Sequence, residues 1–135
     1  MSEIEQARIF LNMAAKDLDA LERMVRHGGF AEEVFGLHAQ QATEKALKAW
    51  LCLLNADCPR THDLDYLIGA IKQCDEEVAE EIQELTDLTD FGALYRYEPY
   101  PDMDESLDRV RTVRQVGALI EHVSRRLNEA DMPNE

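Results

Sequence analysis

Apolar side chains recur every three or four residues over long stretches of this chain, and this spacing constrains its fold more than any other feature. Residues spaced in this way share one face of an amphipathic α-helix, whereas a half-buried strand would alternate apolar and polar residues. The first stretch covers residues 2–26, and its stripe consists of Ile4, Ala7, Phe10, Leu11, Ala14, Leu18, Leu21 and Val25. Ser2 and Glu5 have the spacing of a capping box, and Gly28-Gly29 predicts the end of the helix.

Two further long helices are predicted in the same way. The second covers residues 30–55, and its expected buried side consists of Val34, Leu37, Gln41, Ala42, Ala46, Ala49, Trp50 and Leu53. The last covers residues 104–128, and its stripe consists of Leu107, Val110, Val113, Val116, Leu119, Ile120, Val123 and Leu127. The alanines of the second helix predict the close approach of a neighbouring helix.

Two shorter helices are predicted between the second helix and the last. Thr61 is the expected N-cap of the first, which continues to Ile71. A break at residues 73–75 precedes a helix over residues 77–89, whose inward residues are Val78, Ile82, Leu85 and Leu88. Residues 95–102 contain two prolines, which remove backbone donors, so we expect an ordered loop there.

These elements predict an all-α protein, an up-and-down helical bundle of about five helices, of which two are short. The expected organisation is a single domain over residues 1–129, followed by a flexible C-terminal tail over residues 130–135.

The chain carries 28 acidic and 14 basic side chains, a formal net charge of −14. This balance argues against a broad surface for duplex DNA and against binding to an anionic membrane, because both need clustered Lys and Arg. Residues 75–90 hold eight of the acids and no Lys or Arg, so a small basic pocket elsewhere is compatible with the total. The acidic stretch is interpreted either as a solvated helix face or as a docking face for a basic partner.

No apolar run is long enough to span a bilayer, and the N-terminal residues lack the pattern of a signal peptide, so we expect a cytoplasmic protein. The cysteines are Cys52, Cys58 and Cys74, an odd number that predicts reduced thiols. No CxxC pair occurs, and neither a metal nor a cofactor is predicted.

One polar strip is a candidate site. His38, Gln41, Lys45 and Lys48 are spaced by three, four and three residues, so a helix places them on one side. Two interpretations are open. The strip is either a satisfied polar seam between helices, which the spacing alone favours, or a pocket in which lysine charges and His or Gln hydrogen bonds hold a phosphate or a base.

Two other positions are candidates for the same chemistry. His62 lies near a predicted helix N-terminus, where it either contacts a phosphate or only accompanies the cap. Arg96 and Tyr97 either clamp a phosphate and stack on a base or fasten their loop to the bundle.

These motifs resemble those of the HEPN domain (higher eukaryotes and prokaryotes nucleotide-binding). The resemblance rests on residues 38–49, His-Ala-Gln-Gln-Ala-x-Glu-Lys-Ala-Leu-Lys-Ala, on residues 61–64, Thr-His-Asp-Leu, and on Arg96-Tyr97 before Pro101-Asp102. It covers nearly the whole chain. It implies a helical bundle that often forms a homodimer, in a small prokaryotic protein often encoded beside a minimal nucleotidyltransferase in a toxin–antitoxin-like pair.

Many HEPN proteins are metal-independent ribonucleases in which Arg is followed, after four to six residues, by His. In that chemistry Arg stabilises the charge of the phosphorane and His moves a proton. The motif is not present here; the nearest approximation is Arg114 and His122, with seven residues between them. This absence favours a protein without catalytic activity, and a ribonuclease with a displaced pair stays open as an alternative.

Three hypotheses follow. The first is a nucleotide- or RNA-binding subunit that dimerises and pairs with a separately encoded nucleotidyltransferase. The second is a ribonuclease toxin, with Arg114 and His122, or Arg96 and His62 across a dimer, as its displaced pair. The third is a structural helical adaptor without a ligand.

Overall fold

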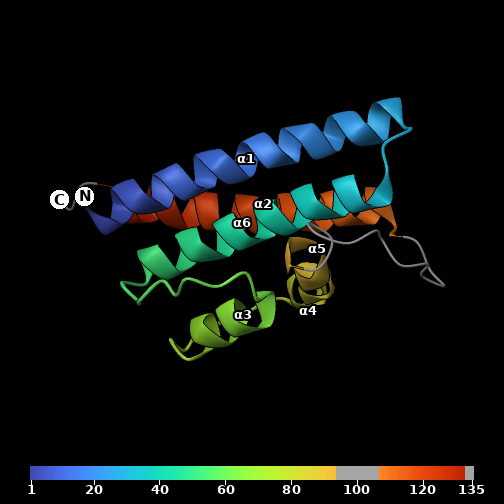
Figure 1. The fold of residues 1–135 in the computed structure, drawn as a ribbon. Coiled ribbons are helices and arrows are strands. Elements are labelled where there is room, and N and C mark those ends of the chain that lie inside the picture. Colours follow the sequence, from blue (N-terminus) through green and yellow to red (C-terminus); the bar gives the residue numbers. More distant parts are fainter. Residues whose placement is uncertain (94–106, 133–135) are drawn as a thin grey trace.

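Long helices form the body of the molecule, as the apolar spacing predicts. The computed structural model describes residues 1–93 and 107–132. Within these residues α1 (Glu3–His27), α2 (Glu32–Leu53) and α6 (Arg109–Ala130) lie side by side, and no strand occurs (Figure 1). The prediction of an all-α bundle is confirmed.

The two ends of α1 have the predicted caps. The Ser2 hydroxyl accepts a hydrogen bond from the backbone N–H of Glu5 at 3.1 Å. At the other end Gly28 has a φ of 70°, a conformation that glycine adopts without the steric cost of a Cβ.

α1 is antiparallel to α2 and α6, which share one direction (Figure 1). Arg8, near the start of α1, pairs with Asp131, just beyond the end of α6, at 2.8 Å. The backbone N–H of Leu107, just before α6, donates to the Glu32 carboxylate at the start of α2 at 2.6 Å. Because α2 and α6 point the same way, the chain must return between them, and residues 54–108 make this return.

α2 is the most enclosed helix, because α1, α6 and most of the short helical segments pack against it. Its fully buried alanines allow the close approach that their positions predict: Ala39, Ala42, Ala46 and Ala49. The buried surface of α2 is wider than the single side predicted from the sequence, because Phe35, Leu47 and Leu51 are also fully buried. Val34, predicted to be buried, is instead 40% exposed, and α2 begins at Glu32 rather than at Phe30.

α3 (Leu64–Lys72) begins two residues later than predicted. Its N-cap is Asp63, whose carboxylate accepts from the backbone N–H groups of Asp65 and Tyr66. The prediction of Thr61 as the N-cap is wrong. The Thr61 hydroxyl accepts a hydrogen bond from the backbone N–H of Asp63 at 3.1 Å and so stabilises the turn before the helix.

The single helix predicted over residues 77–89 is also wrong. The chain forms α4 (Glu80–Gln83), the 3-10 helix η1 (Glu84–Leu88) and α5 (Thr89–Ala93). The buried apolar residues of this segment are spaced by exactly three: Ile82, Leu85, Leu88 and Phe91. A 3-10 helix has about three residues per turn and aligns such residues, whereas an α-helix rotates each of them away from the last.

α6 begins at Arg109, not at residue 104, and the Asp108 carboxylate caps it by accepting from the N–H of Arg111 at 3.0 Å. Val110, predicted to be inward, is 63% exposed because it lies in the first turn, before the helix reaches the core. The loop predicted over residues 95–102 lies outside the described residues. None of the helices in residues 1–93 and 107–132 is long and apolar enough to cross a membrane.

Candidate functional site

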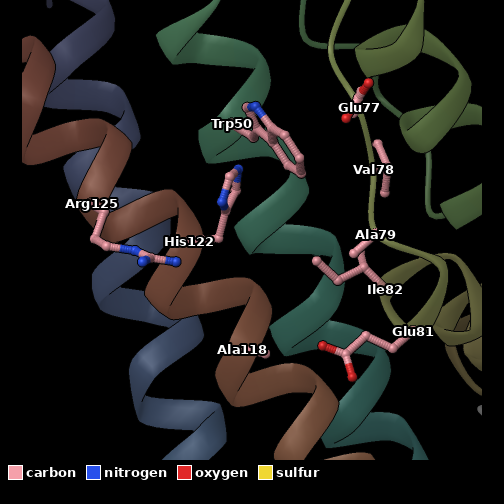
Figure 2. A pocket seen from close by; sticks show the side chains of 9 residues that line it. All are labelled: Trp50, Glu77, Val78, Ala79, Glu81, Ile82, Ala118, His122 and Arg125. Carbon is pink, nitrogen blue, oxygen red and sulfur yellow. The ribbon is translucent and has the colours of Figure 1, made fainter.

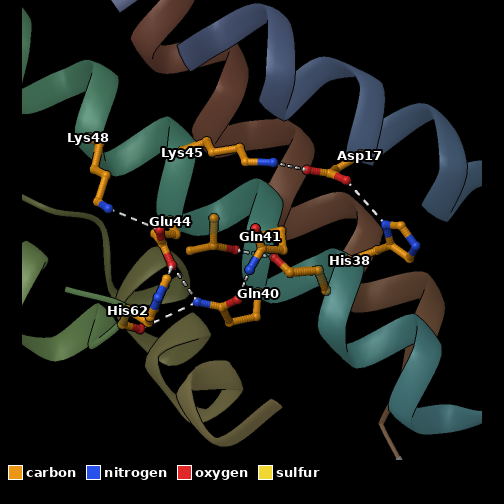
Figure 3. Close-up of polar contacts among 10 residues, drawn as sticks. Asp17, His38, Gln40, Gln41, Glu44, Lys45, Lys48 and His62 are labelled. Atoms are coloured by element: carbon orange, nitrogen blue, oxygen red, sulfur yellow. Dashed lines mark hydrogen bonds and ion pairs between the residues drawn. The ribbon is translucent and has the colours of Figure 1, made fainter. Parts of the chain in front are cut away.

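The predicted polar strip lies along the one edge of α2 that is not fully covered (Figure 3). Its four side chains do not form one group. Three of them, His38, Lys45 and Lys48, divide between two clusters, each organised by a carboxylate that hydrogen-bonds one imidazole and one lysine. We call these the Asp17 cluster (Asp17, His38, Lys45) and the Glu44 cluster (Gln40, Glu44, Lys48, His62).

The Asp17 cluster joins α1 to α2. One carboxylate oxygen of Asp17 lies 3.1 Å from His38 Nδ1, and the other lies 3.1 Å from Lys45 Nζ. His38 and Lys45 are two turns apart on α2, so a single acid on the neighbouring helix holds both. The cluster therefore fixes two predicted site residues through a residue that the sequence did not single out.

The Glu44 cluster joins α2 to the turn before α3. Glu44 is only 5% exposed, and its Oε1 lies 2.7 Å from His62 Nδ1. Lys48 Nζ donates to the other carboxylate oxygen at 3.0 Å, and Gln40 Nε2 donates to Oε1 at 2.9 Å. His62, predicted from the Thr-His-Asp-Leu motif, is thus brought to the same edge as the polar strip.

Gln41 reaches the Glu44 cluster through its neighbour. Its Nε2 donates to Gln40 Oε1 at 2.9 Å, and this contact orients the Gln40 amide toward Glu44. The Gln40 amide also contacts the backbone carbonyl of His62 at 3.4 Å. Gln41 is therefore a supporting residue, one step away from the carboxylate.

Glu44 is held in its ionised form. Burial alone would raise its pKa, but hydrogen bonds from His62, Gln40 and Lys48 outweigh the burial and bring the pKa below its ordinary value. The carboxylate is therefore charged at neutral pH, and it acts only as a hydrogen-bond acceptor.

Three residues of these clusters were missed as site residues: Asp17, Gln40 and Glu44. A local signal for two of them exists in the sequence, because Gln40, Glu44 and Lys48 are spaced by four and share a helix face. Asp17 has no such signal, since its contacts cross from one helix to another.

His122 lies at a different place, in a pocket of about 390 Å³ between α2, residues 77–82 and α6 (Figure 2). Its ring packs against Trp50 with 4.7 Å between the ring centroids. Trp50 Nε1 donates to Glu76 at 3.0 Å, and Arg126 pairs with the same carboxylate oxygen. Burial, followed by the charges of Arg126 and Arg125, lowers the pKa of His122, so this imidazole is neutral at neutral pH.

The remaining candidates are not brought together. Arg114 is exposed and does not line the His122 pocket; eight residues of helix separate the two by a rise of about 12 Å. Arg96 and Tyr97 lie outside the described residues. Across residues 1–93 and 107–132 no group of three or more His, Cys, Asp or Glu side chains could hold a metal ion.

Comparison with protein families gives a match over most of the chain. The model of a family described as the HEPN domain matches residues 7–129, a range that includes both carboxylate clusters. No curated protein and no solved structure matches the chain.

Proposed function

The chain belongs to the HEPN domain family, and on that premise we propose that it is a nucleotide- or RNA-binding subunit. We further propose that it forms a homodimer and works with a separately encoded minimal nucleotidyltransferase in a toxin–antitoxin-like system of a prokaryote.

The observation that carries the binding proposal is the pair of half-exposed imidazoles on the α2 edge. Each is fastened by its Nδ1 to a carboxylate, yet the side chain of His38 is 38% exposed and that of His62 is 54% exposed. Neither Nε2 forms a hydrogen bond within the described part of the chain. Both Nε2 atoms are therefore open to a ligand from solvent, and this feature supports the binding proposal.

Lysine charge accompanies each imidazole. Lys45 and Lys48 lie three residues apart on α2, so their stems leave the helix about 5–6 Å apart. Ammonium groups bind phosphate oxygens as charged donors. Both ammonium groups are paired with a carboxylate, and their side chains are 19% and 13% exposed, so they add positive charge beside the two oriented imidazoles.

The ribonuclease hypothesis has less support. Arg114 is exposed and does not line the pocket of His122 in the described part of the chain. The His122 ring packs against Trp50. The pairing of Arg96 with His62 across a dimer involves a residue outside the described ranges. Intact RNA after incubation with the purified protein is the expected result.

Calorimetry with ATP and with hexauridylate tests the binding proposal. The Lys45→Met/Lys48→Met variant should bind at least tenfold more weakly, because each lost charged hydrogen bond contributes about 1.5–3 kcal/mol. Lys16→Met, which changes an exposed lysine of α1 outside both clusters, is the matched control and should bind like the wild type. Thermal melting confirms that the variants are folded. Equal affinity of all three proteins, or no binding to either probe, would refute the proposal.

Light scattering and co-purification test the assembly. The expected mass is that of two chains, and a nucleotidyltransferase should co-purify from the native host, with its gene next to that of this protein. A mass of one chain contradicts the dimer, and the absence of the neighbouring gene contradicts the partner.

A further inference from the structure

The hydrogen bonds of the two clusters fix where each imidazole carries its proton. Glu44 is an ionised carboxylate and only accepts, so His62 Nδ1 must be protonated to form the 2.7 Å contact. The same reasoning applies to His38 Nδ1 on the Asp17 carboxylate at 3.1 Å. In a neutral imidazole the other nitrogen is then an acceptor. The Nε2 of each neutral ring therefore carries a lone pair.

A lone pair at Nε2 repels an anion. A phosphate oxygen also accepts hydrogen bonds, so it can bind to Nε2 only after Nε2 has gained a proton and become a donor.

The charge balance leads to the same conclusion. Each cluster contains one carboxylate and one ammonium group, which cancel while the imidazole is neutral. Protonation of the imidazole gives the cluster a net charge of +1.

We propose that the α2 edge binds anionic groups together with protons: His38 and His62 each gain a proton at Nε2 when a phosphate group of the ligand binds, and lose it when the ligand leaves. The proton comes from solvent, and no covalent bond forms or breaks. This inference rests on the proposed function and defines how that same site is regulated, since acidification would strengthen binding.

The charged groups around each imidazole support this exchange. His62 faces Glu44 and Lys48 of α2 and is followed by Asp63, whose carboxylate caps α3. His38 faces Asp17 of α1, which also holds Lys45. In both clusters Nδ1 is bound to a carboxylate, so one negative group already faces the ring. A phosphate at Nε2 would add a second negative neighbour.

Calorimetry in two buffers with different ionisation enthalpies tests the inference. At pH 7 the heat of binding should depend on the buffer, and the dependence should correspond to the uptake of up to two protons. Hexauridylate without terminal phosphates is the main probe, because it brings no group that titrates near neutral pH. Its affinity should fall as the pH rises, by up to about tenfold per pH unit for each coupled proton.

Two variants separate the imidazoles from other titrating groups. In the His38→Gln/His62→Gln double variant, the N–H of each glutamine side chain can donate to a phosphate without first gaining a proton. Binding should therefore persist but lose its pH dependence. His27→Gln changes an exposed histidine in the last turn of α1, outside both clusters, and should keep the wild-type dependence. For ATP, the proton uptake of the double variant is subtracted to remove the ionisation of the terminal phosphate.

The outcomes distinguish the two proposals. If neither probe binds between pH 5.5 and 8, the proposed function fails. If a probe binds with the same affinity at every pH, and with heats independent of the buffer, the proposed function stands but proton-coupled binding is refuted. The ligand would then donate a hydrogen bond, such as that of a sugar hydroxyl, to the lone pair of Nε2.

Discussion

A methyl group at Gly36 would collide with Phe91, and this collision gives a quantitative test of the packing between α2 and α5. A Cβ built on Gly36 would lie 2.5 Å from Phe91 Cγ and still closer to two other ring carbons. Phe91 is buried and cannot move aside without displacing its neighbours in the core. We therefore expect Gly36→Ala to destabilise the protein.

The magnitude follows from two opposing effects. Insertion of a methyl group into a packed core costs about 1–3 kcal/mol, and a contact as short as this one lies at the upper end. Alanine in a helix interior gains about 1 kcal/mol over glycine. The net loss in the free energy of unfolding should be about 2 kcal/mol, which corresponds to a melting temperature lowered by about 8 °C.

Gly69→Ala is the matched control, because Gly69 lies inside α3 and a Cβ there meets nothing within 4 Å. It should stabilise the protein by up to about 1 kcal/mol. Thermal and urea unfolding followed by circular dichroism measures both variants. In a Phe91→Ala background, where the ring is absent, Gly36→Ala should lose its penalty. A Gly36→Ala variant as stable as Gly69→Ala would show that the packing argument is wrong.

Three other variants test individual contacts by the same unfolding measurements. Glu44→Gln should cost about 2 kcal/mol, since it removes the charge that His62 and Lys48 contact. The folded-state pKa of Glu44 lies below its ordinary value of 4.5, so this difference from wild type should be complete above pH 4.5 and shrink as the pH falls below it. The wild type should lose stability as the pH falls below 6.5, because the lowered pKa of His122 in the folded state means that the unfolded chain binds the extra proton first. His122→Phe should show a smaller loss of stability over the same pH range. An unchanged pH profile would contradict this. Asp63→Ala should lower the free energy of unfolding by about 1 kcal/mol, because it removes the N-cap of α3, and it should do so by more than Thr61→Ala. The reverse order would support Thr61 as the N-cap.

The sequence predicts those parts of the fold that depend on local spacing. The stripes of α1 and α6 follow from residues three and four apart, and the caps at Ser2 and Gly28 follow from residue type. The segment that contains Leu85 and Leu88 was less predictable. A spacing of three residues fits an α-helix for only one or two turns, and only a longer run of the same spacing distinguishes a 3-10 helix.

The candidate site was predictable only as a list of residues. The spacing placed Lys45 and Lys48 on one side of α2, but their division between two carboxylates depends on Asp17, which is 28 residues away from Lys45. Such a contact is set by how α1 packs on α2. No local pattern indicates which acid faces which base across two helices.

The common direction of α2 and α6 also determines the expected order of folding. α1 and α2 are joined by a short turn and contact each other extensively, whereas Leu107 reaches Glu32 only across 75 residues. Contacts between residues that are near each other in the sequence form with a smaller loss of chain entropy. The α1–α2 pair should therefore form before α6 docks onto it. In stopped-flow experiments, substitutions between α1 and α2 should slow folding, and substitutions on the buried face of α6 should mainly accelerate unfolding. The helix that completes the bundle is then the first to leave it.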